Sequence, residues 1–524
     1  MPSPIATDYD RVAYPSLAHS QTFPENLANR AWLRGMDPAH PGKCRVLELG
    51  CGDGFNLAAM AMIYPESQYT GIDYSSEAIE RGRRMLAELE LGQIRLEAAD
   101  IRDPGIELGE YDYIIVHGVY SWVPEDVRDA ILSLMDHHLA PQGIGFVSYL
   151  AYPGAHLREM LRTMVRFHCR ADAAPSTRIR QSRALLELLS NATSEKNHYT
   201  EWLKTETTLV ASHSDESFFH DELSDISHPV LLTDFLAHAA SHSLQFLSEA
   251  EYLVPIGRLL TESTRDRLRP LETDRILLEQ YLDFVEGRRF RQTLLCRPGL
   301  GAELRVDRLE RLLVSFDGLS DSPPVAPLDA DSPVAFKSAK DAAVSARRPF
   351  EKAAMLELLE RRDALPFPEL RDAVARRMQA ANLPLPAGWD QELALFIVKA
   401  NAPGLIELHW ETPAWASRLP DHPRATALAL WQIAHGDLKI ATLGGTFVKM
   451  EGSLGRNLLS LLDGTLDRAG IMERVRAYIL ERTASGSTRA EGSPPIPSVD
   501  DLQLPAQMEQ GLLGLLSLKL IRRE

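Results

Sequence analysis

Three glycines at alternate positions directly follow a short apolar segment near residue 46, and their spacing suggests a ligand site. The segment 46–54 reads VLELGCGDG, with Glu48 ahead of the glycines. Glycines allow the sharp turn needed where a strand of an α/β sheet ends and a ligand approaches. Asp73 ends the next apolar segment, where its carboxylate could accept hydrogen bonds from both hydroxyls of a ribose. The pattern predicts a site for a nucleoside-containing ligand.

The kind of nucleoside follows from the spacing of the glycines. Dinucleotide sites use G-x-G-x-x-G and place a pyrophosphate on a helix N-terminus. This chain has G-x-G-x-G, and Asp53 stands where the pyrophosphate would lie. S-adenosylmethionine has no phosphate and carries a sulfonium cation, which the carboxylates of Glu48 and Asp53 would attract. S-adenosylmethionine is therefore the expected cofactor, with a dinucleotide site or a purely structural turn as the alternatives.

A third acidic position strengthens this interpretation, because Asp100 and Ile101 follow a third apolar segment. Together these motifs resemble those of the class I S-adenosylmethionine-dependent methyltransferases. The resemblance implies that the ribose lies on Asp73 and that the methionine end lies over the glycine turn. The expected cofactor-binding residues are Tyr14, Glu48, Gly50, Cys51, Gly52, Asp73, Tyr74, Asp100, Ile101 and His117.

Aromatic residues follow the fourth and fifth predicted strands, where an acceptor approaches in this fold. Burial lowers the pKa of a lysine, and aromatic faces hold a cation before it loses its proton. We therefore expect a narrow channel for a lysine amine, with His117 along the cofactor's edge or, alternatively, as a base. Packing against helices is the alternative role for the aromatic rings. The candidate catalytic residues are His117, Tyr120, Trp122, Tyr149 and Tyr152.

Five apolar segments alternate with helical patterns from Val46 to Tyr149, which predicts a parallel, doubly wound α/β sheet. The last two strands are expected late in the chain, after a helical insertion, and they complete a Rossmann-like sheet of seven strands. The predicted strands span residues 45–49, 69–73, 94–98, 113–117, 144–149, 242–248 and 290–296.

The domain organisation follows from length and from Pro-rich stretches, because 524 residues are too many for one core. The predicted S-adenosylmethionine-binding domain spans 1–298, with its insertion at about 155–225, and a linker spans 299–347. A C-terminal α+β, winged-helix-like domain is expected over 348–483, with a hairpin made by Phe396–Ala400 and Leu405–Trp410. Residues 484–524 are expected to form a flexible segment and a terminal helix.

The composition limits the kinds of binding partner and the cellular compartment that we expect. The net charge of −17 argues against a general nucleic-acid binder, which needs clustered Lys and Arg. The four cysteines have no metal-ligand spacing, so no metal is expected. The chain shows neither a signal-peptide pattern nor a long apolar run, so the prediction is a cytoplasmic protein without a membrane partner.

Several further segments narrow the resemblance. Tyr14–Ser16, Tyr149–Arg158, Phe219–Leu223 and Phe290–Cys296 together resemble methyltransferases that carry a methyltransferase regulatory domain. That group includes the protein-lysine methyltransferases of rickettsial bacteria. The resemblance implies a lysine-bearing protein or peptide as substrate, and a homodimer stays open. A small-molecule methyltransferase and a non-catalytic S-adenosylmethionine-binding regulator are the alternative functions.

Overall fold

The computed structural model describes residues 8–169, 173–192, 195–250, 260–301, 303–317, 328–329, 332–337, 343–402, 404–484 and 504–523. Residues 302, 318–327, 330–331 and 338–342 of the expected linker lie outside the described residues, and so do residues 485–503 of the expected flexible segment.

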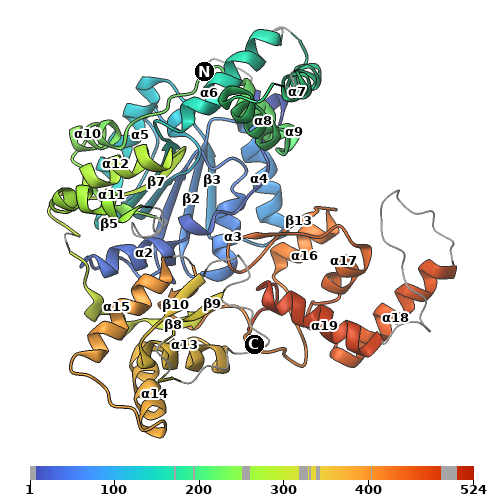
Figure 1. Cartoon of the computed structure of the whole chain (residues 1–524). Coiled ribbons are helices and arrows are strands. Elements are labelled where there is room, and N and C mark those ends of the chain that lie inside the picture. The colour runs from blue at the N-terminus through green and yellow to red at the C-terminus, as the bar shows by residue number, and fades with distance from the viewer. Residues whose placement is uncertain are drawn as a thin grey trace.

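A seven-stranded mixed sheet forms the centre of the N-terminal half (Figure 1). Its order is β3-β2-β1-β4-β5-β7-β6, and β7 runs antiparallel to both β5 and β6. This confirms the predicted Rossmann-like sheet and its seven strands. The strands are β1 Arg45–Leu49, β2 Gln68–Asp73, β3 Ile94–Ala98, β4 Tyr111–Val116, β5 Leu139–Leu150, β6 Gln245–Glu249 and β7 Phe290–Cys296.

The central strands are continuous apolar runs because helices cover both faces of the sheet. Val46 faces one hydrophobic core and Leu47 faces the other, and both are fully buried. One core lies under α2 Pro24–Leu33, α3 Phe55–Ile63 and α4 Ser76–Glu88. The other lies under α5 Glu125–His138 and α10 Leu232–Ser241.

Four helices follow β5 and stand above the carboxyl ends of the strands, at the top of Figure 1. They have a small core of their own, which includes Leu161 and Phe218. They lie where the helical insertion is expected. Their bounds are α6 Ala155–His168, α7 Pro175–Asn191, α8 His198–Ala211 and α9 Asp215–Leu223, and the helices between β6 and β7 are α11 Glu262–Leu268, η3 Arg269–Thr273 and α12 Arg275–Glu286.

The C-terminal half is an additional α+β part with small sheets and two hydrophobic cores. The first core contains η4 Val306–Arg311, β8 Leu313–Phe316, β9 Val334–Lys337, β10 Ala343–Ala346, α13 Pro349–Arg361, β11 Leu365–Pro366, α14 Phe367–Ala380, α15 Trp389–Asn401 and β12 Ile406–His409. The second contains α16 Ala427–Ala434, β13 Lys439–Ala441, β14 Phe447–Lys449, α17 Ser453–Ser460, α18 Arg468–Ala484 and α19 Leu504–Ser517.

The expected hairpin in this half is wrong. Phe396–Ala400 belongs to helix α15, and β12 pairs instead with β8, in the order β11-β8-β12. The apolar residues of α15 recur at helical spacing, with Leu393, Ile397 and Ala400 buried on one side. The range expected as a linker, 299–347, also contains strands, namely β8, β9 and β10. The domain boundaries themselves stay a prediction.

The two halves share hydrophobic surface. Trp32 of α2 lies 5.4 Å from Trp410 between ring centroids, and the Asn29 side chain donates a hydrogen bond to the Leu408 carbonyl. On the other side, Leu428 of α16 and Ala441 of β13 are buried in the same core as α3. The C-terminal half therefore packs against helices that cover one face of the sheet.

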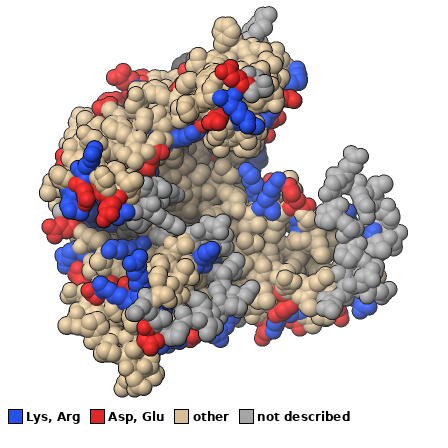
Figure 2. All heavy atoms as spheres, viewed as in Figure 1, with Lys and Arg blue, Asp and Glu red and all other residues tan. Residues whose placement is uncertain are grey.

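The surface is hollowed between the helical insertion and the C-terminal elements in the view of Figure 2. Within the described residues, no helix is both long and apolar enough to cross a membrane.

Candidate functional site

A cavity of about 520 Å³ opens at the carboxyl ends of β1, β2 and β4. We call residues 48–53, 73–75, 100–102 and 117–119 the cavity floor, and residues 9–19 and 219–224 the cavity cover. All of the cofactor-binding residues expected from the sequence line this cavity. They are Tyr14, Glu48, Gly50, Cys51, Gly52, Asp73, Tyr74, Asp100, Ile101 and His117.

The glycine turn brings the floor backbone close to any bound ligand. Gly50 has φ +73°, and a Cβ there would lie 2.3 Å from Val119 Cγ2. Gly52 has φ +58°, and a Cβ there would meet no atom within 4 Å. The left-handed backbone explains why glycine is used at both positions. The turn at Gly50 leaves no room for a side chain, and the turn at Gly52 faces open space.

Asp73 is fixed by the backbone of this turn. Its two carboxylate oxygens accept hydrogen bonds from Gly52 N and Ser75 N, each at 2.8 Å. Burial raises the pKa of Asp73 to about 6, against the lowering effect of these two backbone donors. Each oxygen keeps a second lone pair, so the carboxylate can still accept hydrogen bonds from a ribose.

Glu48 is a buried carboxylate with one free oxygen. Only 4% of its surface is exposed, and Oε1 accepts a hydrogen bond from Asn56 Nδ2 at 2.9 Å. Oε2 has no hydrogen-bond partner in the described part of the chain. Burial raises the pKa of Glu48 to about 8. An unpartnered buried carboxylate oxygen that lines a cavity is suited to a cationic ligand group.

Two histidines stack at the end of β4, and only His117 is expected from the sequence. The rings of His19 and His117 are 3.8 Å apart between centroids. Burial lowers the pKa of His19 to about 4 and the pKa of His117 to about 3, so both imidazoles are neutral near pH 7. Asn56 Oδ1 accepts a hydrogen bond from His19 N at 2.9 Å, which ties the pair to Glu48. No motif marks His19, because it lies in an irregular lead-in.

The cavity cover joins the N-terminal lead-in to α9. The Tyr9 ring stacks on the His220 ring at 4.3 Å, and His220 Nε2 lies 2.7 Å from the Val12 carbonyl oxygen. Beyond these contacts, Ser16 hydrogen bonds to Asp53, and Ser75 hydrogen bonds to Asp10 at 2.5 Å. The Phe219–Leu223 motif, for which the sequence suggests a structural or a substrate-lining role, thus forms part of the cover.

At the far end of the floor, Asp100 forms an ion pair with Arg102 at 2.7 Å. The hydrogen bonds from the Arg102 side chain lower the pKa of Asp100. Tyr74 and Ile101 flank this end of the cavity, and the Tyr74 side chain is half-exposed.

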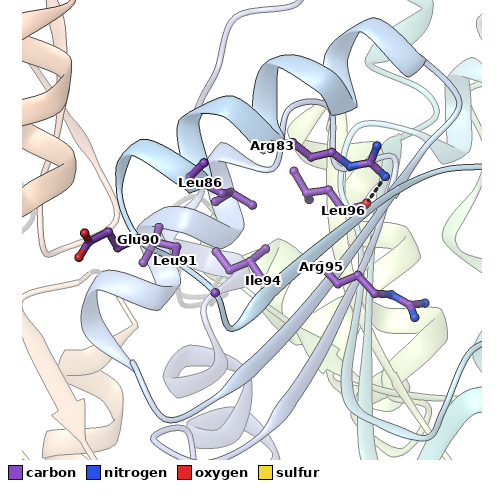
Figure 3. A pocket seen from close by; sticks show the side chains of 9 residues that line it. Arg83, Leu86, Glu90, Leu91, Ile94, Arg95 and Leu96 are labelled. Atoms are coloured by element: carbon purple, nitrogen blue, oxygen red, sulfur yellow. Dashed lines mark hydrogen bonds between the residues drawn. The ribbon is translucent and has the colours of Figure 1, made fainter.

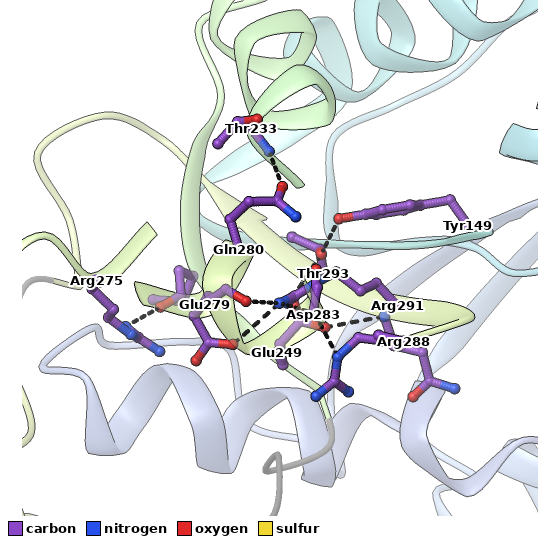
Figure 4. Close-up of polar contacts among 12 residues, drawn as sticks. Tyr149, Thr233, Glu249, Arg275, Glu279, Gln280, Asp283, Arg288, Arg291 and Thr293 are labelled. Carbon is purple, nitrogen blue, oxygen red and sulfur yellow. Dashed lines mark hydrogen bonds and ion pairs between the residues drawn. The ribbon is translucent and has the colours of Figure 1, made fainter. Parts of the chain in front are cut away.

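Of the five candidate catalytic residues, His117 and Trp122 line the cavity, whereas Tyr120, Tyr149 and Tyr152 do not. Tyr149 is buried against Phe235, and its hydroxyl hydrogen bonds to Thr293 Oγ1 at 2.9 Å (Figure 4). Tyr120 is buried in the same core, and its hydroxyl lies 2.8 Å from His238 Nδ1. Tyr152 is partly exposed and packs beside His156, away from the cavity lining.

A second hollow lies along the edge strand β3 and is distinct from the cavity (Figure 3). Its lining is largely apolar, with Leu86, Leu91 and Ile94. The Arg83 side chain borders it and donates a hydrogen bond to the Leu96 carbonyl at 2.9 Å. This contact satisfies one edge acceptor and blocks strand pairing there.

Comparisons with known proteins identify the family. Residues 46–143 match the model of a methyltransferase domain, and residues 214–297 match the model of a predicted methyltransferase regulatory domain. Protein RP028 of Rickettsia prowazekii is 32% identical over 240 residues, which cover 46% of this chain and 96% of that protein. The chain belongs to the class I S-adenosylmethionine-dependent methyltransferases with a methyltransferase regulatory domain.

Two further relatives are similar over longer stretches of this methyltransferase. Protein RP789 of the same organism is 32% identical over 318 residues, or 60% of this chain, and the match spans only 57% of that protein. PKMT2 from Rickettsia typhi has 24% identity and a TM-score of 0.80, with 97% of this chain and 99% of that chain covered. Its complex with AdoHcy gives a TM-score of 0.81 at 23% identity. This likeness shows that the fold is shared along the chain.

The regulatory-domain match is part of the methyltransferase sheet. It contains α9, α10, β6, α11, η3, α12 and β7, so it supplies the last two strands. It also supplies Phe219, His220 and Asp221 of the cavity cover. In this methyltransferase the regulatory segment both completes the fold and closes the site.

The residues of the cavity fit S-adenosylmethionine. The free Glu48 Oε2 suits the ammonium of its methionine part, and the Asp73 carboxylate suits its ribose. The open face of Gly52 allows the ligand to approach the backbone closely. When bound, S-adenosylmethionine supplies the electrophilic methyl group.

Proposed function

We propose that this methyltransferase methylates the side-chain amine of a lysine in a protein or peptide. The charge of the cavity carries the proposal. Five acidic residues line it (Glu48, Asp53, Asp73, Asp100 and Asp221), against Arg81 and Arg102. Burial raises the pKa of Glu48 to about 8, and Asp221 is paired with Arg158 at 3.3 Å, so these two add little negative charge at neutral pH. Arg102 is already paired with Asp100 and Asp126. An acidic cavity attracts a lysine ammonium and disfavours a carboxylate acceptor.

The neutral histidine pair supports an amine acceptor. A lysine ammonium that enters beside the sulfonium must lose a proton before it can attack, and burial together with the neighbouring cation lowers its pKa. Because His19 and His117 are neutral, they add no positive charge and can accept a hydrogen bond from the amine. The low pKa of His117 makes it a poor proton acceptor for lysine, so we assign it to positioning the amine. The proton passes to solvent.

Trp122 forms the remaining aromatic wall of the proposed acceptor path. It lines the cavity, and Arg162 lies over its ring at 5.1 Å. This contact holds the indole in place. The resemblance to rickettsial protein-lysine methyltransferases and the fold shared with PKMT2 agree with a protein substrate.

The deciding experiment uses S-adenosylmethionine with a labelled methyl group and the full chain. Label in a lysate should enter the protein fraction, resist mild base, and appear as N-methyllysine after acid hydrolysis. A peptide with one lysine should be modified, whereas its Lys→Arg counterpart should not.

Other results would point to the alternatives. Base-labile label would indicate a carboxylate acceptor, and label in small molecules would indicate a metabolite acceptor. Cofactor binding with no transfer to any fraction would favour the regulator.

A further inference from the structure

Two histidines and an aspartate converge on the face of the sheet opposite α3 and α4. His238 lies in α10, His242 follows the end of that helix, and Asp129 lies in α5. The two histidines are four residues apart, which puts them on one side of the helix. One nitrogen or oxygen of each residue lies within 4.8 Å of the others.

The separations are close to those of a metal's ligands. Asp129 Oδ1 lies 2.8 Å from His242 Nε2 and 3.4 Å from His238 Nε2. In a tetrahedral zinc site, with metal–ligand bonds of about 2.0–2.1 Å, neighbouring ligand atoms are about 3.3 Å apart. The Asp129–His242 contact of 2.8 Å is a hydrogen bond and is shorter than this separation, so these two side chains must move slightly apart to take an ion between them.

Tyr120 fixes the ring of His238, as the hydrogen-bond partner of a metal-bound histidine does. Its hydroxyl lies 2.8 Å from His238 Nδ1. When Nδ1–H donates to the phenol oxygen, the lone pair of Nε2 faces Asp129, and a cation between them relieves the repulsion. Tyr120 is itself fixed, because it is 2% exposed and packs edge-on against Phe235 at 5.1 Å. A buried group that orients the far nitrogen of a histidine is typical of metal sites.

The cluster is also open to solvent. The Asp129 side chain is 61% exposed, and the two histidine side chains are 27% and 17% exposed. An ion can reach the cluster, and water can complete its coordination. Two imidazoles and one carboxylate form a nitrogen and oxygen donor set of the kind that binds Zn²⁺ and neighbouring divalent transition metals.

We propose that Asp129, His238 and His242 bind a divalent transition-metal ion, for which Zn²⁺ is the first choice. The site is separate from the cofactor cavity and does not take part in methyl transfer. It is connected to the cavity through Tyr120, because η2 Tyr120–Trp122 also contains Trp122 of the cavity lining. The bound ion would hold the segment Tyr120–Trp122 in place from outside the cavity.

The test titrates untagged, chelator-treated full-length protein with Zn²⁺ by calorimetry and with Co²⁺ by visible absorption. One equivalent should bind, and Co²⁺ should give the absorption of a four-coordinate site. His242→Gln and Asp129→Asn should each weaken binding at least 100-fold, and Tyr120→Phe should weaken it about 10–100-fold. His137→Gln is the control, since it removes an exposed histidine of the same helix α5 and should leave binding unchanged.

Thermal unfolding provides a second readout. Zn²⁺ should raise the melting temperature of the wild type and of His137→Gln, but not of Asp129→Asn, because only a protein with an intact site gains stability from the ion. Asp129 is exposed, so Asp129→Asn should fold. Absence of stoichiometric binding, or binding unchanged in Asp129→Asn, would show that the three residues form only a hydrogen-bonded cluster.

Discussion

The cavity floor and the cavity cover differ in how their residues are brought together. In the floor, hydrogen bonds such as Gly52 N to Asp73 join residues at the ends of adjacent strands β1 and β2. In the cover, His220 contacts Val12 from 208 positions away. The sheet fixes the floor, whereas the cover forms only when the lead-in and the helical insertion meet. We infer that the floor determines cofactor binding and that the cover determines retention and access of the acceptor.

Replacing Asp73 with Ala should produce the largest effect. The variant loses the acceptor for a ribose and for two backbone N–H groups of the floor. Hydrogen bonds to a charged group contribute about 1.5–3 kcal/mol, so affinity for S-adenosylmethionine should fall about 10–150-fold. Calorimetry measures it, with the exposed Glu66→Ala at the opposite end of β2 as control. Equal affinities in the two variants would remove Asp73 from the site.

The pH dependence of cofactor binding tests the other floor carboxylate. Because the pKa of Glu48 is raised to about 8, the group is largely protonated below that pH and must lose its proton to hold a cation. Affinity should therefore rise with pH up to about 8 and level off above, by at most about tenfold per pH unit. In Glu48→Gln the affinity should no longer rise toward pH 8. Only a weaker rise near pH 6 should remain, and this rise reflects Asp73. If the affinity of Glu48→Gln still rises through pH 8, the rise comes from the titration of another group.

A change in the cover should be milder. His220→Leu removes the contact to the Val12 carbonyl and the stacking on Tyr9 while it keeps side-chain bulk. The loss of about 1 kcal/mol corresponds to about fivefold weaker cofactor binding, seen mainly as faster release in stopped-flow experiments. His198→Leu, at an exposed histidine of the same insertion, is the control. If His220→Leu weakens binding as strongly as Asp73→Ala, the cover belongs to the primary binding surface.

The smallest effect is expected for Tyr14→Phe. Tyr14 lines the cavity but is 42% exposed, so water can replace its hydroxyl contacts. Cofactor affinity should change by about twofold or less, the lower limit for one hydrogen bond. Turnover of a protein substrate, measured in parallel, should fall more than affinity does if the cover guides the acceptor. Tenfold weaker cofactor binding would instead assign Tyr14 to the floor.

Strand-level features could be predicted well because they depend on local patterns. The apolar runs of β1, β2 and β4 placed the glycine turn and Asp73, and all of the predicted cofactor-binding residues line one cavity. The late strands β6 and β7 were found from their apolar residues, although an insertion of four helices precedes them. The hairpin failed because the apolar residues of α15 suit a strand as readily as a helix when read over only five positions.

The residues at the acceptor end of the cavity could not be predicted from local sequence patterns in the same way. Tyr149 follows the expected strand, but successive side chains of a strand point to opposite faces. Phe146 packs in the core on the α3 face of the sheet, whereas Val147 and Tyr149 face α10. The Tyr149 hydroxyl therefore points away from the cavity. The same core holds Tyr120, so of the residues expected at the acceptor end only His117 and Trp122 line the cavity.

The sequence by itself determined the fold class, the cofactor and the floor, because glycine conformation and strand ends are local properties of the chain. Only the tertiary structure decided the stacking of His19 on His117, the contact of His220 with Val12 and the grouping of Asp129 with two histidines. These contacts join segments separated by about 100 residues or more. They depend on how helices pack above and below the sheet, and no spacing along the chain encodes that.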